Sequence, residues 1–228
     1  MNKIRFDILT SMPDSFESVL STGIIRIAAE RKIADIHIHN LHNYSRDKFG
    51  HIDDTPYGGG AGMLIMCEPV FECAEKLMQE RKYDEVIYVT ADGERFNQTA
   101  ANEISLNSNI MVICGRYKGI DQRIRDILVT REISIGDFVL TGGELAAMII
   151  MDSVIRLIPG AISDSESALE DSFQDGLLEP PYYTRPENFR GHKVPDVLLS
   201  GNHEEIKKWR IEQAIDKTRN LRPDLLED

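Results

Sequence analysis

The chain has 228 residues, of which 42% are hydrophobic and 28% are charged, and its formal net charge is −12. This composition is ordinary for a soluble globular protein and excludes a disordered chain, and the length allows one domain or one domain with a small second one. The longest apolar run, 145–151, is far shorter than the roughly 20 residues of a membrane span.

Strand-like and helix-like segments alternate over residues 1–160, which predicts an α/β fold with a mostly parallel sheet. The last two of the expected strands are almost entirely apolar, as strands buried on both faces should be. The expected strands are 4–9, 35–39, 63–66, 86–90 and 110–114. The expected helices are 14–31, 68–81, 98–106, 121–128 and 144–157.

Residues 161–176, "AISDSESALEDSFQDG", are acidic and rich in serine, without apolar periodicity, and are typical of a flexible linker. Residues 177–228 follow as a small helical tail domain. Asn202 with Glu205 forms a capping box there. The helix that begins at this box carries an apolar stripe of Ile211, Ala214, Ile215 and Thr218.

The amino-terminal segment "MNKIRFDILTSMPDSF" lacks the apolar core of a secretory signal peptide, so we expect a cytoplasmic protein. Cys67, Cys73 and Cys114 are unclustered and are interpreted as free thiols in a reducing compartment. His37, His39 and His42 raise the question of a metal site. No Cys or Glu completes a ligand set beside them, and we expect no metal there.

The negative net charge argues against a nucleic-acid partner, yet the charge is unevenly distributed. Residues 161–176 hold five acidic and no basic groups, whereas residues 177–228 hold nine basic and ten acidic groups. The basic residues of this nearly neutral tail are bunched, which indicates either a local basic surface or simply a solvated face. They are Arg185, Arg190 and Lys193, and then Lys207, Lys208 and Arg210.

Glycines gather in loops that follow the expected buried strands. "CGRYKGID" (114–121) follows one strand, and "SIGDFVLTGGE" (134–144) encloses a short apolar run that could itself be a strand. Ligands of open α/β sheets bind beyond the carboxyl ends of the strands, so these loops indicate main chain that approaches a ligand. Neither loop has the spacing of a Walker or Rossmann motif, and tight turns are the structural alternative.

Three further features permit both a functional and an ordinary structural explanation. "DDTPYGGGAGM" (53–63) is either a mobile surface loop or a ligand loop in which Tyr57 stacks on a base. Arg156 is placed to complement the dipole of the helix before it. Asp171, within the acidic segment, is by itself a solvated charge.

Taken together, these motifs resemble the bacterial tRNA (guanine-N1)-methyltransferases, the TrmD family of the SPOUT class. The resemblance runs over nearly the whole chain through "DDTPYGGGAGM", "CGRYKGIDQR", "SIGDFVLTGGELAAM", "SALEDSF", "YYTRP" and "VPDVLLSGNHEEIKKWR", in that order. It implies that 1–160 form an S-adenosylmethionine-binding domain with a deep trefoil knot, that 177–228 bind tRNA, and that the enzyme is a homodimer with active sites at the subunit interface.

The resemblance also implies roles for individual residues. The cofactor would be bound by Tyr88, Val89, Thr90, Gly115, Tyr117, Gly119, Ser134, Ile135, Gly136, Asp137, Phe138, Val139, Leu140, Gly142 and Gly143. The tRNA would be bound by Tyr57, Gly58, Gly59, Gly60, Gly62, Ser167, Lys207, Lys208 and Arg210. The methyl group would go to N1 of guanosine 37, on the 3′ side of the anticodon. Asp171, from the other subunit, would take the N1 proton, and Arg156 would face O6.

Four residues differ from those usual in the family, namely Lys118, Phe138, Thr141 and Ala91. Phe138 cannot donate a hydroxyl hydrogen bond, and Lys118 removes a carboxylate near the cofactor. The family reaction is linked to Mg²⁺, but the sequence shows no ligand set for it. A ribose 2′-O-methyltransferase of the same class and a non-catalytic RNA-binding module remain as alternatives.

Overall fold

The computed structural model describes residues 3–162 and 171–226. The chain forms two compact units, Met1–Ser165 and Glu166–Asp228. No helix in the described ranges is long and apolar enough to cross a membrane.

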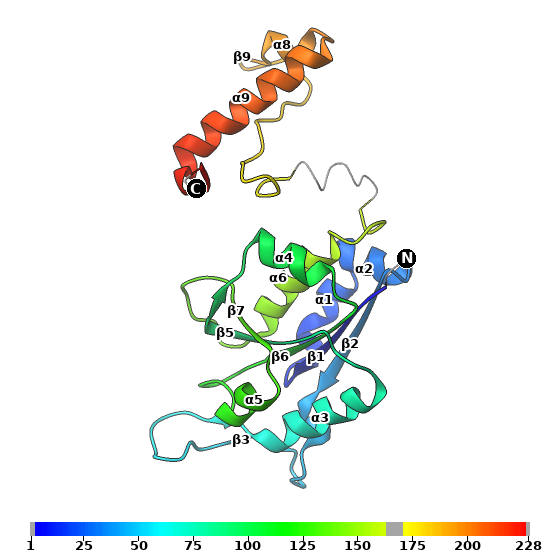
Figure 1. Ribbon diagram of the computed structural model, residues 1–228, viewed down its shortest axis with the longest axis vertical. Coiled ribbons are helices and arrows are strands. Elements are labelled where there is room, and N and C mark those ends of the chain that lie inside the picture. Colours follow the sequence, from blue (N-terminus) through cyan, green and yellow to red (C-terminus); the bar gives the residue numbers. More distant parts are fainter. Residues whose placement is uncertain (1–2, 163–170, 227–228) are drawn as a thin grey trace. The chain divides into compact units, whose positions relative to one another are not determined.

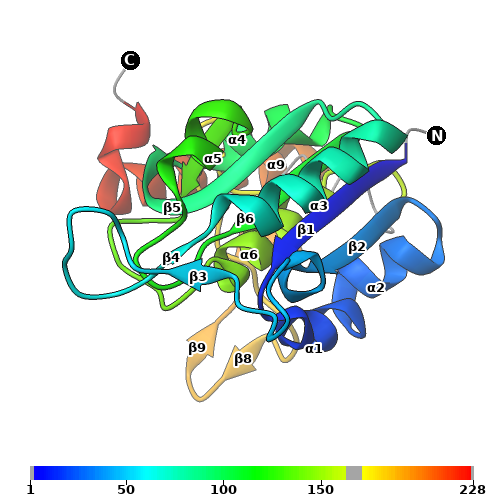
Figure 2. The same ribbon diagram turned by 90° about the horizontal axis from the view of Figure 1, so that it is seen from below.

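The first unit is built on a five-stranded parallel sheet with the strand order β2-β1-β6-β5-β7, as Figures 1 and 2 show. The predicted α/β class is therefore confirmed. The strands are β1 (Ile4–Thr10), β2 (Ala34–Asn40), β5 (Glu85–Arg95), β6 (Asn109–Cys114) and β7 (Arg131–Ser134).

Helices cover both faces of this sheet (Figure 1). The period of two along β6 divides its side chains between two cores: Ile110 and Val112 pack in one, and Met111 and Ile113 pack in the other. The first core includes residues of α2 (Gly23–Glu30), α4 (Gln98–Ser105) and α6 (Glu144–Ile155). The second includes residues of α3 (Cys67–Glu80) and α5 (Gln122–Ile127). Strands covered in this way must be apolar on both sides, which explains their sequence.

Three predictions about elements were wrong. The helix expected over 14–31 is divided into η1 (Pro13–Phe16), α1 (Glu17–Leu20) and α2, because Thr22 is extended and Gly23 has φ +61°. The strand expected at 63–66 is only β4 (Leu64–Ile65), which pairs with β3 (Asp53–Asp54) in a separate antiparallel hairpin.

The third wrong prediction concerns the apolar run 138–140, which is a loop and not a strand. The preceding strand of the sheet is β7, which ends at Ser134. After β2 the chain forms η2 (Leu41–Tyr44).

The second unit contains a small hairpin, β8 (Asn188–Phe189) and β9 (His192–Lys193), followed by α8 (Asp196–Leu199), α9 (His203–Leu221) and η3 (Pro223–Leu226). Asn202 caps α9 as predicted, since its side chain accepts a hydrogen bond from the Glu205 N–H. Ala214 and Thr218 of the predicted stripe are buried, but Ile211 is 48% exposed.

The ends of the expected linker pack within their own units, while 163–170 lie outside the described residues. Ala161 is buried in the first core. Ser172 and Glu179 are joined by two hydrogen bonds: the Ser172 N–H donates to the Glu179 carboxylate, and the Ser172 hydroxyl accepts from the Glu179 N–H.

Candidate active site

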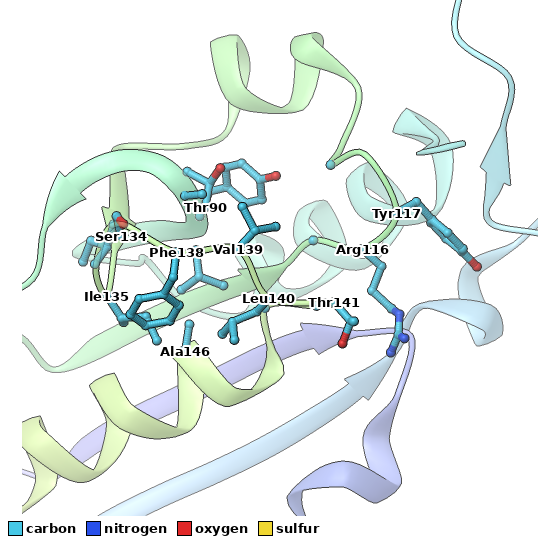
Figure 3. A pocket seen from close by; sticks show the side chains of 18 of the residues that line it. Thr90, Arg116, Tyr117, Ser134, Ile135, Phe138, Val139, Leu140, Thr141 and Ala146 are labelled. Carbon is cyan, nitrogen blue, oxygen red and sulfur yellow. The ribbon is translucent and has the colours of Figure 1, made fainter. Parts of the chain in front are cut away.

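A pocket lies at the carboxyl ends of β6 and β7 and at the middle of β5, where the pairing with β7 shifts register, and Figure 3 shows side chains around it. All the residues expected to bind the cofactor line this pocket except Asp137. Six further residues line the pocket, and three of them, Lys118, Thr141 and Ala91, are named above only as departures from the family. The six are Ala91, Arg116, Lys118, Ile133, Thr141 and Ala146.

The missed residues carried a recoverable signal. Ala91, Arg116, Lys118 and Thr141 are direct neighbours of expected residues in the same loops, so a loop-by-loop expectation would have included them. Ala146 lies in the first turn of α6, and Ile133 lies in a strand that was not predicted.

Gly143 shows why one wall of the pocket is main chain. A Cβ atom at this position would lie 2.5 Å from Val89 Cγ2, 3.0 Å from Cys114 Cα and 3.1 Å from Gly115 N. The Gly143 N–H donates to the Gly115 carbonyl at 2.8 Å. The two glycine loops therefore touch through their backbones, and a side chain at 143 would push them apart.

Gly115 makes a similar close approach to Tyr88. A Cβ atom at 115 would lie 2.9 Å from the Tyr88 hydroxyl oxygen. The Tyr88 side chain is buried, and burial raises its pKa against the lowering effects of Thr90 and of Arg125, whose guanidinium carbon lies 5.5 Å from the ring centroid. Tyr88 therefore lines the pocket as a neutral, buried side chain.

The loop after β7 forms the apolar side of the pocket. Gly136 has φ +147° and its carbonyl accepts both from the Ser134 hydroxyl at 3.0 Å and from the Phe138 N–H at 2.9 Å. This turn leaves Phe138 54% and Val139 86% exposed. Adjacent exposed apolar side chains around a hollow are typical of a binding surface for an organic ligand.

The buried carboxylate of Glu144 contacts β1 and the 115–119 loop. Glu144, in the first turn of α6, accepts a hydrogen bond from the Thr10 hydroxyl at 2.8 Å, and its other oxygen lies 4.0 Å from Arg116 Nη1. Arg116 also forms a bridge with the Gly142 main chain. A negative group is favourable at the amino terminus of a helix. Through its contacts with Thr10 and Arg116, Glu144 connects α6 with β1 and with the 115–119 loop.

The expected tRNA loop is tied to the expected cofactor loop. The Lys118 N–H donates to the Met63 carbonyl at 3.1 Å, and the Ile65 N–H donates to the Gly119 carbonyl at 3.1 Å. Tyr57, at the tip of this loop, is fully exposed. The residues expected here to bind tRNA do not line the pocket itself, but their loop is hydrogen-bonded to one of its walls. They are Tyr57, Gly58, Gly59, Gly60 and Gly62.

The two expected catalytic residues belong to different units. Arg156 is the C-cap residue of α6, where its N–H donates to the Asp152 carbonyl. Asp171 lies in the second unit, where its carbonyl accepts from the Gln174 N–H. Ser167 lies outside the described residues. The structure therefore does not bring the expected acid–base pair together within one described unit.

The basic residues expected to bind tRNA lie on α9. Lys207, Lys208 and Arg210 are all exposed, and the Lys208 ammonium lies 4.0 Å from the Glu212 carboxylate. An exposed pair at this separation contributes little to stability, so these cations stay accessible to a solvent-borne anion.

His39 and His42 of the segment considered above for metal binding make polar contacts within the first unit. Asp7 is fully buried in β1, and its carboxylate accepts hydrogen bonds from Arg5 and from the Tyr83 hydroxyl, with His39 Nε2 at 2.7 Å. Burial would raise the pKa of Asp7, but the hydrogen bonds from His39, Arg5 and Tyr83 outweigh it and hold the pKa well below its usual range. His42 Nδ1 lies 2.8 Å from the Gly50 carbonyl oxygen.

Within residues 3–162 and 171–226, no three His, Cys, Asp or Glu side chains are grouped to hold a metal ion. Lys118 places a cation among the pocket residues.

Comparison with known proteins identifies the family of the chain. A sequence model described as tRNA (guanine-1)-methyltransferase TrmD matches residues 4–228. The chain belongs to this family. A tRNA (guanine-N(1)-)-methyltransferase of Bacteroides thetaiotaomicron is 53% identical over 225 residues, covering 99% of this chain and 100% of the relative.

A second relative shows that the similarity is not restricted to one lineage. The tRNA (guanine-N(1)-)-methyltransferase of Chlorobaculum tepidum is 54% identical over 223 residues, covering 98% of this chain and 97% of the relative. Because TrmD proteins are methyltransferases, the family also implies S-adenosylmethionine as the methyl donor in general. Neither the ribose 2′-O-methyltransferase nor the non-catalytic module is favoured by these matches.

Proposed function

We propose that this member of the TrmD family transfers a methyl group from S-adenosylmethionine to N1 of guanosine 37 in tRNA. The observation that carries the proposal is the pocket at the strand ends, in which glycine main chain forms one wall and exposed apolar side chains form another. We further propose the cytoplasm as the place of action, since the tRNA substrate is found there.

The residues of the pocket fit the proposed cofactor. Adenine is a flat heterocycle that needs an apolar slot and main-chain hydrogen-bonding partners. The exposed Phe138 and Val139 offer the apolar surface, and the glycines at 115, 142 and 143 leave main chain uncovered. When bound, S-adenosylmethionine supplies a methyl group on a positively charged sulfur. We propose that the loops adopt the deep trefoil knot of SPOUT proteins, with the contact between Gly143 and Gly115 at the crossing.

The reaction requires a proton acceptor and a cation. Methyl transfer forms an N1–carbon bond and breaks the carbon–sulfur bond, and the proton on guanine N1 must leave. We propose that the Asp171 carboxylate takes this proton and that the Arg156 guanidinium stabilises the negative charge that grows on O6. A carboxylate in water is a weak base, so we propose that the segment that carries Asp171 closes over the site and excludes water from it.

Helix α6 supports the proposed homodimer. Leu145 is 58% exposed and Ile149 is 47% exposed, although most of the helix is buried. Positions 145, 149, 152 and 156 lie on one side of a helix with 3.6 residues per turn, so the exposed Asp152 and then Arg156 follow the two apolar residues on this face. An apolar helix face of this kind needs a cover. A second subunit on the stripe would place Arg156 at the interface, where Asp171 of the other subunit would complete the site.

The remaining tRNA contacts follow the two loops and the tail. We propose that the loop with Tyr57 and Gly58–Gly62 holds the target nucleotide, that Ser167 contributes to the same site, and that Lys207, Lys208 and Arg210 bind phosphates. The exposed Tyr57 ring can stack on a base.

One assay tests the proposal. The purified protein is incubated with labelled S-adenosylmethionine and an unmodified tRNA transcript that carries guanosines at 36 and 37, and the product is digested to nucleosides. We expect labelled 1-methylguanosine from this transcript and none from a transcript in which guanosine 37 is replaced by another nucleotide. A product methylated on ribose, or no labelled nucleoside, contradicts the proposal.

The role of Asp171 is tested by Asp171→Asn. We expect the single-turnover rate to fall by about 10²- to 10⁴-fold, the usual contribution of a general base. Asp175→Asn is the matched control, because Asp175 lies in the same segment and accepts a hydrogen bond from the Leu177 N–H that an Asn oxygen can also accept. Equal rates in the two variants would remove Asp171 from the mechanism.

A further inference from the structure

The junction between the loop 55–63 and the loop 115–119 carries a cation that the mechanism does not use. We propose that the Lys118 ammonium, together with main-chain N–H groups of the glycine-rich loop, binds one phosphodiester of the RNA next to the target guanosine. The proposal rests on the proposed function, since it names how the same site holds its RNA.

The stem of Lys118 is packed on the glycine loop. A Cβ atom at Gly62 would lie 2.9 Å from Lys118 Cγ and 3.1 Å from both Cδ and Cε. Three successive methylene groups therefore lie against the main chain, in space that only glycine leaves open. A lysine that served solubility alone would extend into water, whereas this stem is held along the loop.

The ammonium at the end of this stem is available. A Cβ atom at Gly60 would lie 4.0 Å from Lys118 Nζ, which places the charge beside the middle of the loop. Within the described part of the chain, Nζ makes no ion pair or hydrogen bond. The nearest carboxylate along the chain, Asp121, is already paired with Arg123 at 2.7 Å. Its pKa is held low by that pairing, so it stays ionised and engaged.

The loop adds donors to this charge. Gly60 and Gly62 have φ +110° and +97°, and in the described ranges the N–H groups of Gly60, Ala61 and Gly62 donate to no protein acceptor. Main-chain N–H groups in turns with such conformations form concave binding sites for anions. A cation fixed beside them makes the group suited to a phosphate, which offers several acceptor oxygens and a full negative charge.

An RNA phosphodiester fits this position better than the carboxylate of the cofactor. The glycines that form the cofactor wall are 115, 142 and 143, whereas Lys118 Nζ is directed along the neighbouring loop to Gly60. The loop is also hydrogen-bonded to the pocket through the Lys118 N–H and the Met63 carbonyl. A phosphate held there would position the nucleotide that follows it at the mouth of the pocket.

The test compares Lys118→Gln and Lys118→Arg with Lys82→Gln. Lys82 is an exposed lysine that precedes β5, at the edge of the sheet opposite to the pocket. Binding of the unmodified tRNA transcript is measured over a series of salt concentrations, and S-adenosylmethionine binding is measured by calorimetry. The Gln side chain keeps most of the stem, and the Lys118 N–H bond to Met63 is unaffected, so the fold is retained.

We expect Lys118→Gln to weaken RNA binding by about threefold to tenfold and to reduce the slope of log K against log salt by about 0.7, the value for one phosphate of a single strand. Lys118→Arg should keep the slope, and Lys82→Gln should match the wild type. Because Lys118 also lines the pocket, the affinity for S-adenosylmethionine is a second readout: it should change less than the RNA affinity in Lys118→Gln and should equal the wild-type value in Lys82→Gln.

A chemical change in the RNA locates the contact. Uncharged methylphosphonate linkages are placed one at a time on either side of guanosine 37. One of them should weaken binding to the wild type and leave binding to Lys118→Gln unchanged. An unchanged salt slope in Lys118→Gln, or a loss confined to S-adenosylmethionine binding, overturns the proposal. Formation of 1-methylguanosine by the wild type in the same experiment separates this failure from a failure of the proposed function.

Discussion

Gly143→Ala is the substitution whose outcome the geometry determines most directly. Gly143 has φ −80°, a conformation that alanine adopts without strain, so the effect comes from the added methyl group alone. That methyl group would lie 2.5 Å from Val89 Cγ2 and about 3 Å from main chain at 114 and 115. Backbone atoms cannot rotate away from the overlap as a flexible side chain can.

The size of the effect follows from three contributions. Overpacking of this kind costs about 1–3 kcal/mol, and replacement of an N-cap glycine by alanine costs a few tenths more. The loss of chain entropy in the unfolded state returns about 0.4–1 kcal/mol. The net loss is about 1–2 kcal/mol, which lowers Tm by roughly 2–8 °C for a unit of this size.

The same overlap should weaken cofactor binding. Relief of the clash moves the 140–143 loop away from Gly115 and lengthens the 2.8 Å hydrogen bond between them. We expect the Kd for S-adenosylmethionine, measured by calorimetry, to rise by about tenfold, which corresponds to 1.4 kcal/mol. Gly23→Ala is the control: Gly23 has φ +61° and open space around a Cβ atom, so it should cost about 1–2 kcal/mol of stability without a change in Kd. Gly143→Ala with wild-type Tm and Kd would refute the reasoning.

Three further predictions concern charge, association and thiols. Because hydrogen bonding lowers the pKa of buried Asp7, its contribution to stability is complete above the unfolded pKa of about 4 and is lost as pH falls below it. In urea titrations, Asp7→Asn should therefore lower the free energy of unfolding by about 3–5 kcal/mol at pH 7. Between pH 7 and pH 3 the stability of the variant should also decrease less steeply than that of the wild type. Leu145→Glu should convert the proposed dimer to a monomer in sedimentation experiments and abolish methyl transfer, whereas a persisting dimer would exclude this face as the interface. Burial raises the pKa of Cys67 to about 11 and of Cys73 to about 12, and it raises the pKa of Cys114 well above its ordinary value. Ellman's reagent at pH 8 should therefore react slowly with all three thiols in the folded protein and rapidly after unfolding.

The parts of the fold that were predictable share one property, a side-chain pattern produced by burial. The apolar strand 110–114 and helix 144–157 were predicted almost to their observed ends, since the strand is buried on both faces of the sheet and most residues of the helix are buried in the first core. Strand β7 was missed because it is short and begins with two charged, half-buried residues, Arg131 and Glu132, before the buried Ile133 and Ser134. The division of 14–31 depended on a main-chain angle at Gly23, which no periodicity reveals.

The candidate site was predictable through the resemblance and much less through its residue types. A site made of side chains can be predicted from Asp, His or Cys residues at a fixed spacing in the sequence. In this pocket, glycine main chain forms much of the lining. Its glycines could equally serve turns. The buried Glu144 shows the same limit, since its partner Thr10 is far away in the sequence and nothing local marks the carboxylate as buried.

The contacts of Gly143 connect these two observations. A Cβ atom at position 143 would lie within about 3 Å of atoms from β5, from the end of β6 and from the loop after β6. Because glycine has only a hydrogen atom there, the start of α6 can lie directly against these segments. The same meeting point brings uncovered main chain beside the exposed Phe138–Leu140 segment. The same close approach therefore makes Gly143 important both for the fold and for the pocket. For this reason we expect stability and cofactor affinity to fall together at position 143 and to separate at position 23.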